Sequence, residues 1–371
     1  MSEMMKNVVV CCDGAANEFA EDRTNVIKLY FTLVDDPATQ VAYYHPGVGT
    51  MEPPGALTRY SRAATKLLGQ AVGYGLEADV RDAYTFIMRY FSAGDRLYLF
   101  GFSRGAYTVR AVTSLLKMYG LMRPGSEALI PYAIRMMMAI RNTNQSSPAS
   151  QQKAADAYFK LAEDFRQTYG KVSCQPHFVG VWDTVSSVGW IDNPLHLPYS
   201  ADNGDIAIGR HAVAIDERRA FFRTNLWRPG PAGGPRDLKQ VWFPGVHCDV
   251  GGGYPEAESG LSKIALQWML REAKQAGLLV DAVKETAQLG GDGRYVRPDP
   301  RAQMHESLRG WWHLAEFVPK KHYDWTTKET EKRPNLYRSR TIPPGAMIHT
   351  SAYERGAEYS GKLPAGAIIV D

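Results

Sequence analysis

The sequence predicts an α/β fold in which a mostly parallel central sheet carries helices on both faces. Two observations indicate this class. Short runs of consecutive apolar residues, typical of strands buried on both faces, alternate along the chain with longer segments whose apolar residues recur at helical spacing. Gly and Pro also contribute 34 and 22 of the 371 residues, which favours many tight loops over a helical bundle. Alternating strands and helices predict parallel strands joined by helical crossovers.

The expected strands are short apolar runs that end at a turn signal or a polar residue. The first run is followed directly by Asp13-Gly14, and a later run follows the turn Gly94-Asp95. We expect strands over residues 7–12, 40–44, 96–100, 178–182 and 240–243. The stretch 206–223 is expected to mix helix and turn.

The expected helices lie between these strands. They cover residues 25–33, two segments within 62–92 (the second at 77–91), 105–118, most of 126–169, and 261–276. We place one break at Gly73–Gly75 and another at the polar stretch 142–152. Residues 277–371 show weak periodicity and are expected to form a loop-rich C-terminal extension packed on the domain. No linker divides the chain, so a single domain over 1–371 is predicted.

The composition excludes several kinds of partner and site. Lys and Arg total 43 against 39 Asp and Glu, and no basic run concentrates the net charge of +4, so nucleic acid is not expected as a partner. No segment approaches the ~20 apolar residues that span a bilayer, and the N-terminal apolar run is too short for a signal peptide. The four cysteines (Cys11, Cys12, Cys174 and Cys248) have neither zinc-site nor disulfide spacing. We therefore expect reduced thiols and a cytoplasmic location, with any export independent of a signal peptide.

The strongest functional signal is the motif Gly101-Phe102-Ser103-Arg104-Gly105, a G-x-S-x-G match. An apolar strand precedes it and a helix-compatible run follows it. The two glycines allow a strand to turn directly into a helix, so that the serine hydroxyl stands exposed at the apex. The amides at the helix N-terminus, that of Arg104 first, would stabilise an oxyanion. A glycine-rich turn that merely holds a serine is the structural alternative.

A serine nucleophile needs a base and a group that orients the base. In hydrolases with this motif the chain order is Ser, then acid, then His, and Asp183 and His247 follow two of the expected strands in that order. Two competitors stay open. Asp249 could orient a histidine or cap a turn, and His211 could serve as the base.

The loop after the first strand has three interpretations. Gly14 and Ala15 could donate backbone N–H groups to the oxyanion hole, with Asp13 in support. Asp13 could instead be a phosphatase-type nucleophile, although Ala15 stands where a second carboxylate would be expected. A purely structural turn is the third. The glycines 251–253 are not read as a phosphate-binding loop, because no Lys-Ser/Thr follows them.

Several of these segments together resemble one known family. It is the domain-of-unknown-function α/β-hydrolases grouped with the catalytic domain of type VI secretion phospholipase effectors, the Tle1-like class. The matching segments are 8–17, 99–110, 178–189, 211–222 and 241–254. The resemblance implies an α/β-hydrolase fold, with Ser103 as nucleophile, Asp183 as acid and His247 as base. The family usually has Thr where this chain has Ala15.

Hydrolases of this fold commonly insert a cap between the nucleophile and the acid, and we expect a helical cap at 126–176. Its run 130–140 contains three consecutive methionines, which suit either an acyl-chain pocket or a helix packed on the core. The cluster of Trp311, Trp312, His313, Tyr323 and Trp325 could line a pocket or pack structurally.

The function predicted from the sequence is a serine hydrolase that cleaves carboxylic esters through an acyl-enzyme intermediate. Lipid or phospholipid acyl esters are the first choice of substrate, and no metal or organic cofactor is required. The partners considered are the lipid substrate, a membrane surface contacted peripherally, and a secretion-system or immunity protein. Two alternatives stay open: a weakly active or inactive binding module, and a metal-dependent phosphoesterase that uses Asp13.

Overall fold

The computed structural model describes most of the 371-residue chain. Outside the described residues lie 1–4, 15–22, 48–69, 140–147, 171, 186–188, 191–192, 195–196, 221, 229–232, 311–312, 314–315, 318 and 324–329. Only the backbone is described at 70–74, 148–155, 189–190, 193–194, 320–323 and 330. The expected Ala15 donor and Trp311, Trp312 and Trp325 of the expected aromatic cluster therefore lie outside the described residues. Of the same cluster, His313 is exposed, and only the backbone of Tyr323 is described.

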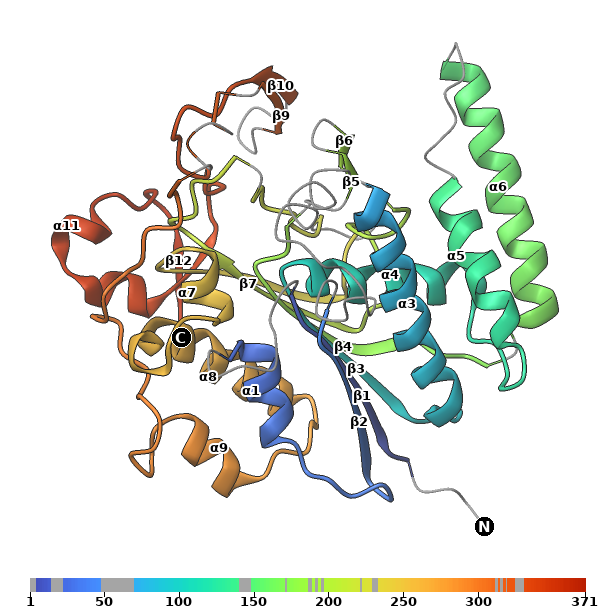
Figure 1. Ribbon diagram of the computed structural model, residues 1–371, viewed down its shortest axis with the longest axis horizontal. Coiled ribbons are helices and arrows are strands. Elements are labelled where there is room, and N and C mark those ends of the chain that lie inside the picture. The colour runs from blue at the N-terminus through green and yellow to red at the C-terminus, as the bar shows by residue number, and fades with distance from the viewer. Residues whose placement is uncertain are drawn as a thin grey trace, which may run out of the picture.

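An eight-stranded sheet forms the centre of the molecule (Figure 1). In spatial order its strands are β2 (Gln40–His45), β1 (Asn7–Cys12), β3 (Arg96–Phe102), β4 (Pro176–Trp182), β7 (Ile208–Ala214), β8 (Asp237–Phe243), β11 (Met347–His349) and β12 (Ile368–Val370). Every neighbouring pair in this sheet is parallel. Parallel strands bring their carboxyl ends to one edge, which is where such sheets place their functional groups.

Helices cover both faces of the sheet (Figure 1). One layer contains α3 (Gln70–Tyr90), α4 (Arg104–Tyr119), α5 (Ile130–Ala139) and α6 (Pro148–Tyr169). The other contains α1 (Asn25–Thr32), α8 (Gly260–Gln275) and the short α9 (Ala282–Gln288). The predicted α/β class, with a parallel sheet between helical layers, is confirmed.

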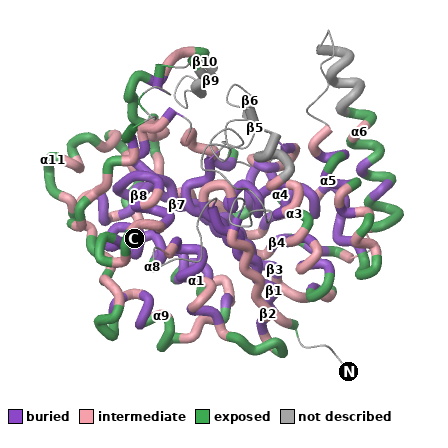
Figure 2. Tube along the Cα trace, viewed as in Figure 1, coloured by how far each residue is buried: buried purple, intermediate pink, exposed green. Residues whose placement is uncertain are grey.

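The first strand shows how the sequence builds both layers. Val8, Val10 and Cys12 pack with α3 and α4, whereas Val9 and Cys11 pack with α1 and α8. All five side chains are buried, as expected for a strand covered on both faces, and Figure 2 shows the buried strands running through the middle of the molecule. Each fully buried valine contributes about 1.5–3 kcal/mol of transfer free energy.

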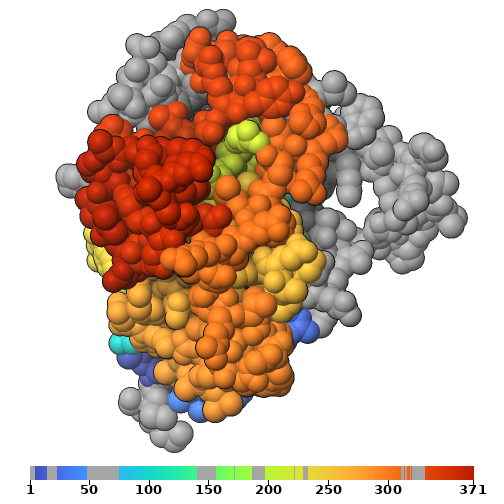
Figure 3. Space-filling view, turned by 90° about the vertical axis from the view of Figure 1, so that its left-hand side faces the viewer, coloured from blue at the N-terminus to red at the C-terminus, as the bar shows by residue number. Residues whose placement is uncertain are grey.

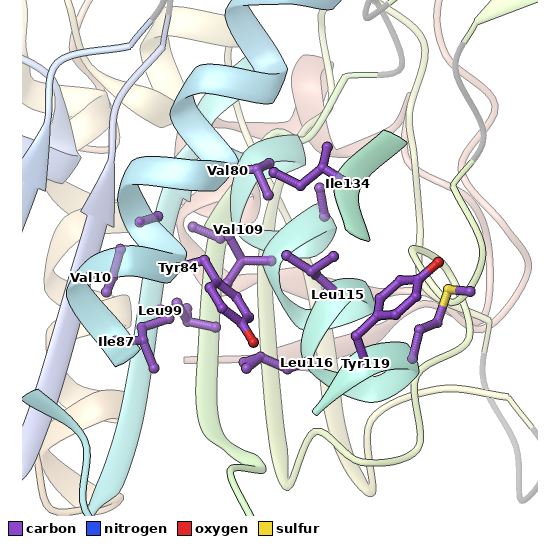
Figure 4. Packing of buried hydrophobic residues seen from close by; sticks show 14 of the residues in the cluster. Val10, Val80, Tyr84, Ile87, Leu99, Val109, Leu115, Leu116, Tyr119 and Ile134 are labelled. Atoms are coloured by element: carbon purple, nitrogen blue, oxygen red, sulfur yellow. The ribbon is translucent and has the colours of Figure 1, made fainter. Parts of the chain in front are cut away.

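The α3–α4 side of the core interlocks closely (Figure 4). Val10 and Leu99 from the strands point toward Tyr84 and Ile87 of α3, and Val109 of α4 lies beside them. The hydroxyl of Tyr84 donates to the carbonyl of Gly120 at 2.8 Å and accepts from the N–H of Met122 at 3.0 Å. This buried phenol therefore ties α3 to the end of α4.

The segment expected to form a cap packs mainly as an outer layer of this core. Met136 and Met137 of α5 are buried in the cluster built by α3 and α4, and α6 packs against α4. The short helix Glu127–Leu129 leads into α5. The two methionines thus serve as core residues, and the cap over 126–176 stays a prediction. Within the described part of the chain, every helix is too short or too polar to cross a membrane.

The C-terminal segment is more regular than its sequence suggests. It contributes β11 and β12 to the central sheet, so these residues are part of the domain and not only a loop-rich extension. Figure 3 shows this segment, in orange to red, covering one side of the molecule. Its further elements are β9 (Lys320–Tyr323), β10 (Thr330–Arg333), the helix Thr350–Arg355 and α11 (Ala357–Ser360). Strands of three residues are too short for a periodic pattern, which explains why the sequence did not reveal them.

Two other expectations were wrong. The stretch 206–223 contains β7, a buried strand between β4 and β8. Its run from Arg210 to Ala214 includes charged and small residues, so it lacks the apolar signature of the other strands. The expected break at Gly73–Gly75 is absent, because α3 continues through these glycines. A glycine weakens a helix by only about 1 kcal/mol, and tertiary packing overrides that cost.

Candidate active site

Ser103 occupies a sharp turn between β3 and α4. Its φ of 57° and ψ of −118° are unusual for a residue with a side chain. A Cβ on Gly101 would lie 2.5 Å from the carbonyl oxygen of Gly105, and a Cβ on Gly105 would lie 2.1 Å from that of Cys12. Only glycine fits at both positions. The motif therefore forms the strand-to-helix turn that the sequence predicts, with Ser103 at its apex.

His247 lies beside Ser103. Its Nε2 is 2.8 Å from the Ser103 Oγ, and it is the first residue of the short helix α7 (His247–Gly251), which follows β8. The imidazole contacts the rings of Phe102 and Phe222, with centroids 4.6 and 4.8 Å away. Its backbone N–H donates to the carboxylate of Glu217 at 3.2 Å. The ring is thus held from two sides and only 3% of the residue is exposed.

Asp183 completes the hydrogen-bonded series. It follows β4, has a φ of 35°, and its Oδ2 lies 2.5 Å from the Nδ1 of His247. Its Oδ1 accepts from the N–H of Ala214 at 3.0 Å. Burial by itself would raise the pKa of this fully buried carboxyl, but Arg340 and His247 outweigh burial and hold the pKa of Asp183 well below its usual range. Asp183 is therefore charged in the folded protein.

The sheet explains why residues so distant in sequence meet. Ser103, Asp183 and His247 follow β3, β4 and β8 at the carboxyl edge of one parallel sheet. The ladder continues past the strands, since the N–H of Ser103 donates to the carbonyl of Trp182 at 3.1 Å and that of Asp183 donates to Ala212 at 2.7 Å. The structure thus brings together the three residues that the sequence singled out.

The loop after β1 differs from its expected role. Asp13 is 1% exposed; its Oδ1 accepts from the N–H of Gly14 at 2.7 Å, and its Oδ2 accepts from Thr24 at 2.6 Å and Tyr44 at 2.8 Å. The N–H of Gly14 is therefore engaged by Asp13 and does not point to an oxyanion. A buried carboxylate with three donors holds a loop in place, which argues against Asp13 as a nucleophile.

Arg104 is the first residue of α4. The first amides of a helix have no intrahelical acceptor and carry the positive end of the helix dipole, so the N–H of Arg104 stays the candidate oxyanion donor. Among the described residues there is no cluster of three or more His, Cys, Asp or Glu side chains that could hold a metal ion.

Asp249 contacts a different histidine from the one beside Ser103. Its Oδ1 lies 2.6 Å from the Nδ1 of His305, and its Oδ2 accepts from the N–H of Val246 at 3.0 Å. It therefore both caps α7 and orients a histidine, but that histidine belongs to the C-terminal segment. The next glycine also has a packing role, since a Cβ on Gly251 would lie 1.9 Å from the ring of Phe102.

His211 is a structural residue of β7. It is fully buried, and its Nε2 accepts from the N–H of Thr184 at 3.2 Å. Burial, together with the nearby Arg110, lowers the pKa of His211 to about 3, so the ring stays neutral. Through Thr184 it supports the loop that follows Asp183, and it is not the base beside Ser103.

Sequence reasoning missed two residues around the site. Glu217, three residues after the end of β7, accepts from the backbone N–H of His247 and pairs with Arg219. Arg340 lies 2.6 Å from Asp183 Oδ1. Glu217 stands inside a segment that the family resemblance covers, so that segment carried a signal. Arg340 stands in a loop without any pattern, and only the tertiary structure reveals it.

These features define an α/β-hydrolase-type domain with a serine at the strand-to-helix turn. The chain belongs to the family described as "T6SS, Phospholipase effector Tle1-like, catalytic domain", whose model matches residues 6–272. The earlier resemblance to this family is confirmed. The matched region contains Ser103, Asp183 and His247, whereas Arg340 lies beyond it.

Individual proteins are also similar to this chain in sequence or in structure. An uncharacterized protein of Saccharomyces cerevisiae, YEL023C, is 31% identical over 233 residues, which cover 61% of this chain and 33% of that protein. The chain thus spans about a third of the length of this relative. A crystal structure of an uncharacterized protein from Pseudomonas aeruginosa has a TM-score of 0.42 and 20% identity, covering 74% of this chain and 46% of that one. The structure of the Tle1 effector bound to the VgrG spike of the type 6 secretion system has a TM-score of 0.37 and 19% identity, covering 69% and 52%.

Proposed function

We propose that the chain is a serine hydrolase that cleaves carboxylic esters, with Ser103 as nucleophile, His247 as general base and Asp183 as the orienting acid. The observation that supports this proposal is the hydrogen-bonded series from Ser103 Oγ through His247 to Asp183, with distances of 2.8 and 2.5 Å. A catalytic base must lie within hydrogen-bond reach of the proton that it removes, and this geometry meets that requirement.

The reaction proceeds through an acyl-enzyme. Ser103 Oγ attacks the ester carbonyl carbon while its proton passes to His247 Nε2, and the imidazolium then gives this proton to the departing alcohol oxygen. Water repeats the sequence at the acyl-enzyme and releases the carboxylic acid. Asp183 holds the Nδ1–H tautomer throughout and stabilises the transient imidazolium. Proton transfer by a positioned base contributes about 10²–10⁴-fold to the rate.

The oxyanion would be held by backbone amides. The N–H of Arg104 stands at the N-terminus of α4, next to the nucleophile, and each such donor is worth about 10²–10³-fold in kcat. Because Asp13 engages Gly14, Ala15 is the second donor in this proposal, as the sequence suggests. Asp13 then acts in support, since it fixes the start of this loop.

We propose lipid or phospholipid acyl esters as the substrate class. This choice follows the description of the family, which names phospholipase effectors. The same description supports export by a type VI secretion system, a route that needs no signal peptide. Secretion of the tagged chain into the medium, compared in hosts with and without a working type VI sheath, tests the export; equal amounts in both media would contradict it.

A fluorophosphonate probe tests the proposed nucleophile. We expect the wild-type protein to be labelled in the presence of a chelator, and Ser103→Ala to lose both labelling and the hydrolysis of short p-nitrophenyl esters. Ser126→Ala is a matched control, because the side chain of Ser126 makes no capping bond to its helix. It should behave as wild type.

Two other outcomes would overturn the proposal. Activity that persists in Ser103→Ala but disappears with the chelator would indicate a metal-dependent reaction. A folded wild-type protein that is not labelled and hydrolyses no ester would favour the binding-module alternative. A phospholipid panel with analysis of the released fatty acids then tests the substrate class separately.

A further inference from the structure

Besides His247, the carboxylate of Asp183 has a charged partner, Arg340. Arg340 Nη1 donates to its Oδ1 at 2.6 Å and Nη2 donates to its Oδ2 at 3.1 Å. One guanidinium therefore holds both carboxylate oxygens, in the forked geometry that only arginine supplies. Asp183 Oδ2 is shared between this arginine and His247.

Arg340 is fixed by the backbone as well. Its Nη1 donates to the carbonyl of Ala214 at 3.0 Å, and its Nε and Nη2 donate to that of Phe222 at 3.2 and 2.5 Å. Only 6% of its side chain is exposed. Phe222 is also the residue whose ring contacts His247. The guanidinium of Arg340 thus connects Asp183, the last residue of β7 and Phe222, whose ring packs against His247.

The turn that carries Arg340 is itself anchored. The buried carboxylate of Glu316 accepts from Asn335 Nδ2 at 2.7 Å, from the N–H of Tyr337 at 3.1 Å and from the N–H of Ala220 at 2.7 Å. Leu336 and Tyr337 have φ values of 49° and 63°, a conformation that persists only where surrounding contacts maintain it. The turn is therefore built to a defined shape, and it delivers Arg340 to Asp183.

We propose that Arg340 is a positioning residue of this active site: it fixes the carboxylate of Asp183 toward His247 and holds a permanent positive charge against that carboxylate. The proposal rests on the hydrolase function proposed above. The family model matches residues 6–272, and Arg340 lies beyond them. In this proposal the C-terminal segment therefore completes the active site.

Two physical effects follow from this contact. The fork removes the rotational freedom of the carboxylate, so that Oδ2 stays aligned with the imidazole Nδ1–H. The positive charge also stabilises the carboxylate anion and opposes a further positive charge at this place by Coulomb repulsion. Loss of this charge should therefore be visible in the acid limb of the pH–rate profile, which reports interacting groups together.

The test compares three variants of the full chain. Arg340→Met removes the charge and the donors but keeps the length; Arg340→Lys keeps the charge but lacks the fork. Arg338→Met is the matched control, because Arg338 lies two residues away in the same turn and is exposed. The measurements are kcat and KM for a p-nitrophenyl ester as a function of pH, with circular dichroism to establish that each variant is folded.

We expect kcat of Arg340→Met to fall about 10–100-fold with KM nearly unchanged, since Asp183 touches no substrate; complete loss of the orienting acid costs about 10⁴-fold. The acid limb of kcat/KM should move to higher pH by about one unit or more. Arg340→Lys should keep the wild-type acid limb but lose part of kcat. Should Arg340→Met fail to fold, the lysine variant carries the test alone.

A spectroscopic signal separates this proposal from the proposed function. The proton between His247 Nδ1 and Asp183 should give a proton NMR resonance far downfield of the amides, and Asp183→Asn assigns it by its loss. In Arg340→Met the pH midpoint of this resonance should rise, whether or not the protein cleaves an ester. A wild-type acid limb, kcat and resonance in folded Arg340→Met, matching those of Arg338→Met, would overturn the role of Arg340. If the wild-type protein cleaves no ester while the resonance still responds to Arg340→Met, only the proposed hydrolase function would be overturned.

Discussion

Substitution of Gly105 by alanine tests the close approach of α4 to β1, on which the turn at Ser103 depends. The added Cβ would lie 2.1 Å from the carbonyl oxygen of Cys12 and 2.4 Å from that of Asp13. The first distance is about 1.3 Å short of ordinary contact, and both partners are backbone atoms, which cannot move aside by a rotamer change.

The expected loss of stability follows from these contacts. Overpacking by one methyl group costs about 1–3 kcal/mol, and two backbone clashes place Gly105→Ala near the upper limit. Alanine returns about 1 kcal/mol, because it restricts the unfolded chain and favours the helix. The net loss is therefore about 2 kcal/mol. The control is Gly204→Ala, whose Cβ would meet only one atom, at 3.9 Å; it should be neutral or stabilise by about 0.4–1 kcal/mol.

Urea unfolding of both variants provides the measurement. With an m value of about 3 kcal/mol/M, the two midpoints should differ by about 1 M. Ester hydrolysis by Gly105→Ala should fall by about 10²-fold or more, because the turn carries both Ser103 and the amide of Arg104, and a shift of about 1 Å is costly in catalysis. Equal midpoints for Gly105→Ala and Gly204→Ala would refute the close approach and the argument for the glycine.

Three further outcomes are expected. Ser103→Gly should be more stable than Ser103→Ala by about 1 kcal/mol in urea unfolding, because a φ of 57° strains any residue with a side chain, while both variants are inactive; the reverse order would contradict this strain. The pKa of Asp183 is depressed, so its contribution to the free energy of unfolding is present above about pH 4 and is lost as the pH falls. Asp183→Asn should be less stable than the wild type at neutral pH, but between about pH 5 and 3 it should lose less unfolding free energy than the wild type does. Burial by itself would lower the pKa of His305, but its hydrogen bonds to Glu258 and Asp249 outweigh burial and raise it. The contribution of His305 to the free energy of unfolding is therefore present below about pH 6.5 and is lost at higher pH. The difference in unfolding free energy between wild type and His305→Gln should therefore shrink from about pH 6 to 9, and a constant difference would argue against the ion pair.

The sequence predicted those parts of the fold in which local pattern and tertiary role agree. The strands 7–12 and 178–182 are apolar because they are buried on both faces, so their pattern and their position carry the same information. Strand β7 was missed because its buried residues include Arg210 and His211, whose polar groups are satisfied by partners in other elements. Such partners cannot be read from the strand itself.

The active-site residues also divide into those that a local pattern predicts and those that depend on the rest of the fold. Ser103 stands in a motif whose glycines are required by local geometry, and Asp183 and His247 follow recognisable strands. The expected donor at Gly14 proved to be engaged by Asp13, because a carboxylate can turn back onto the next amide of its own loop. No local pattern distinguishes that conformation from one in which the amide faces a substrate.

The sequence by itself determined the α/β class, the glycine-dependent turn at Ser103 and the order of the groups that follow the strands. These are properties of short segments, set by side-chain periodicity and by the space that a Cβ requires. Only the tertiary structure decided that Asp249 pairs with His305, that β11 and β12 complete the sheet, and that Arg340 holds Asp183. The physical reason is that these contacts join residues far apart in the chain, and their energy depends on burial and charge that exist only after the chain has folded.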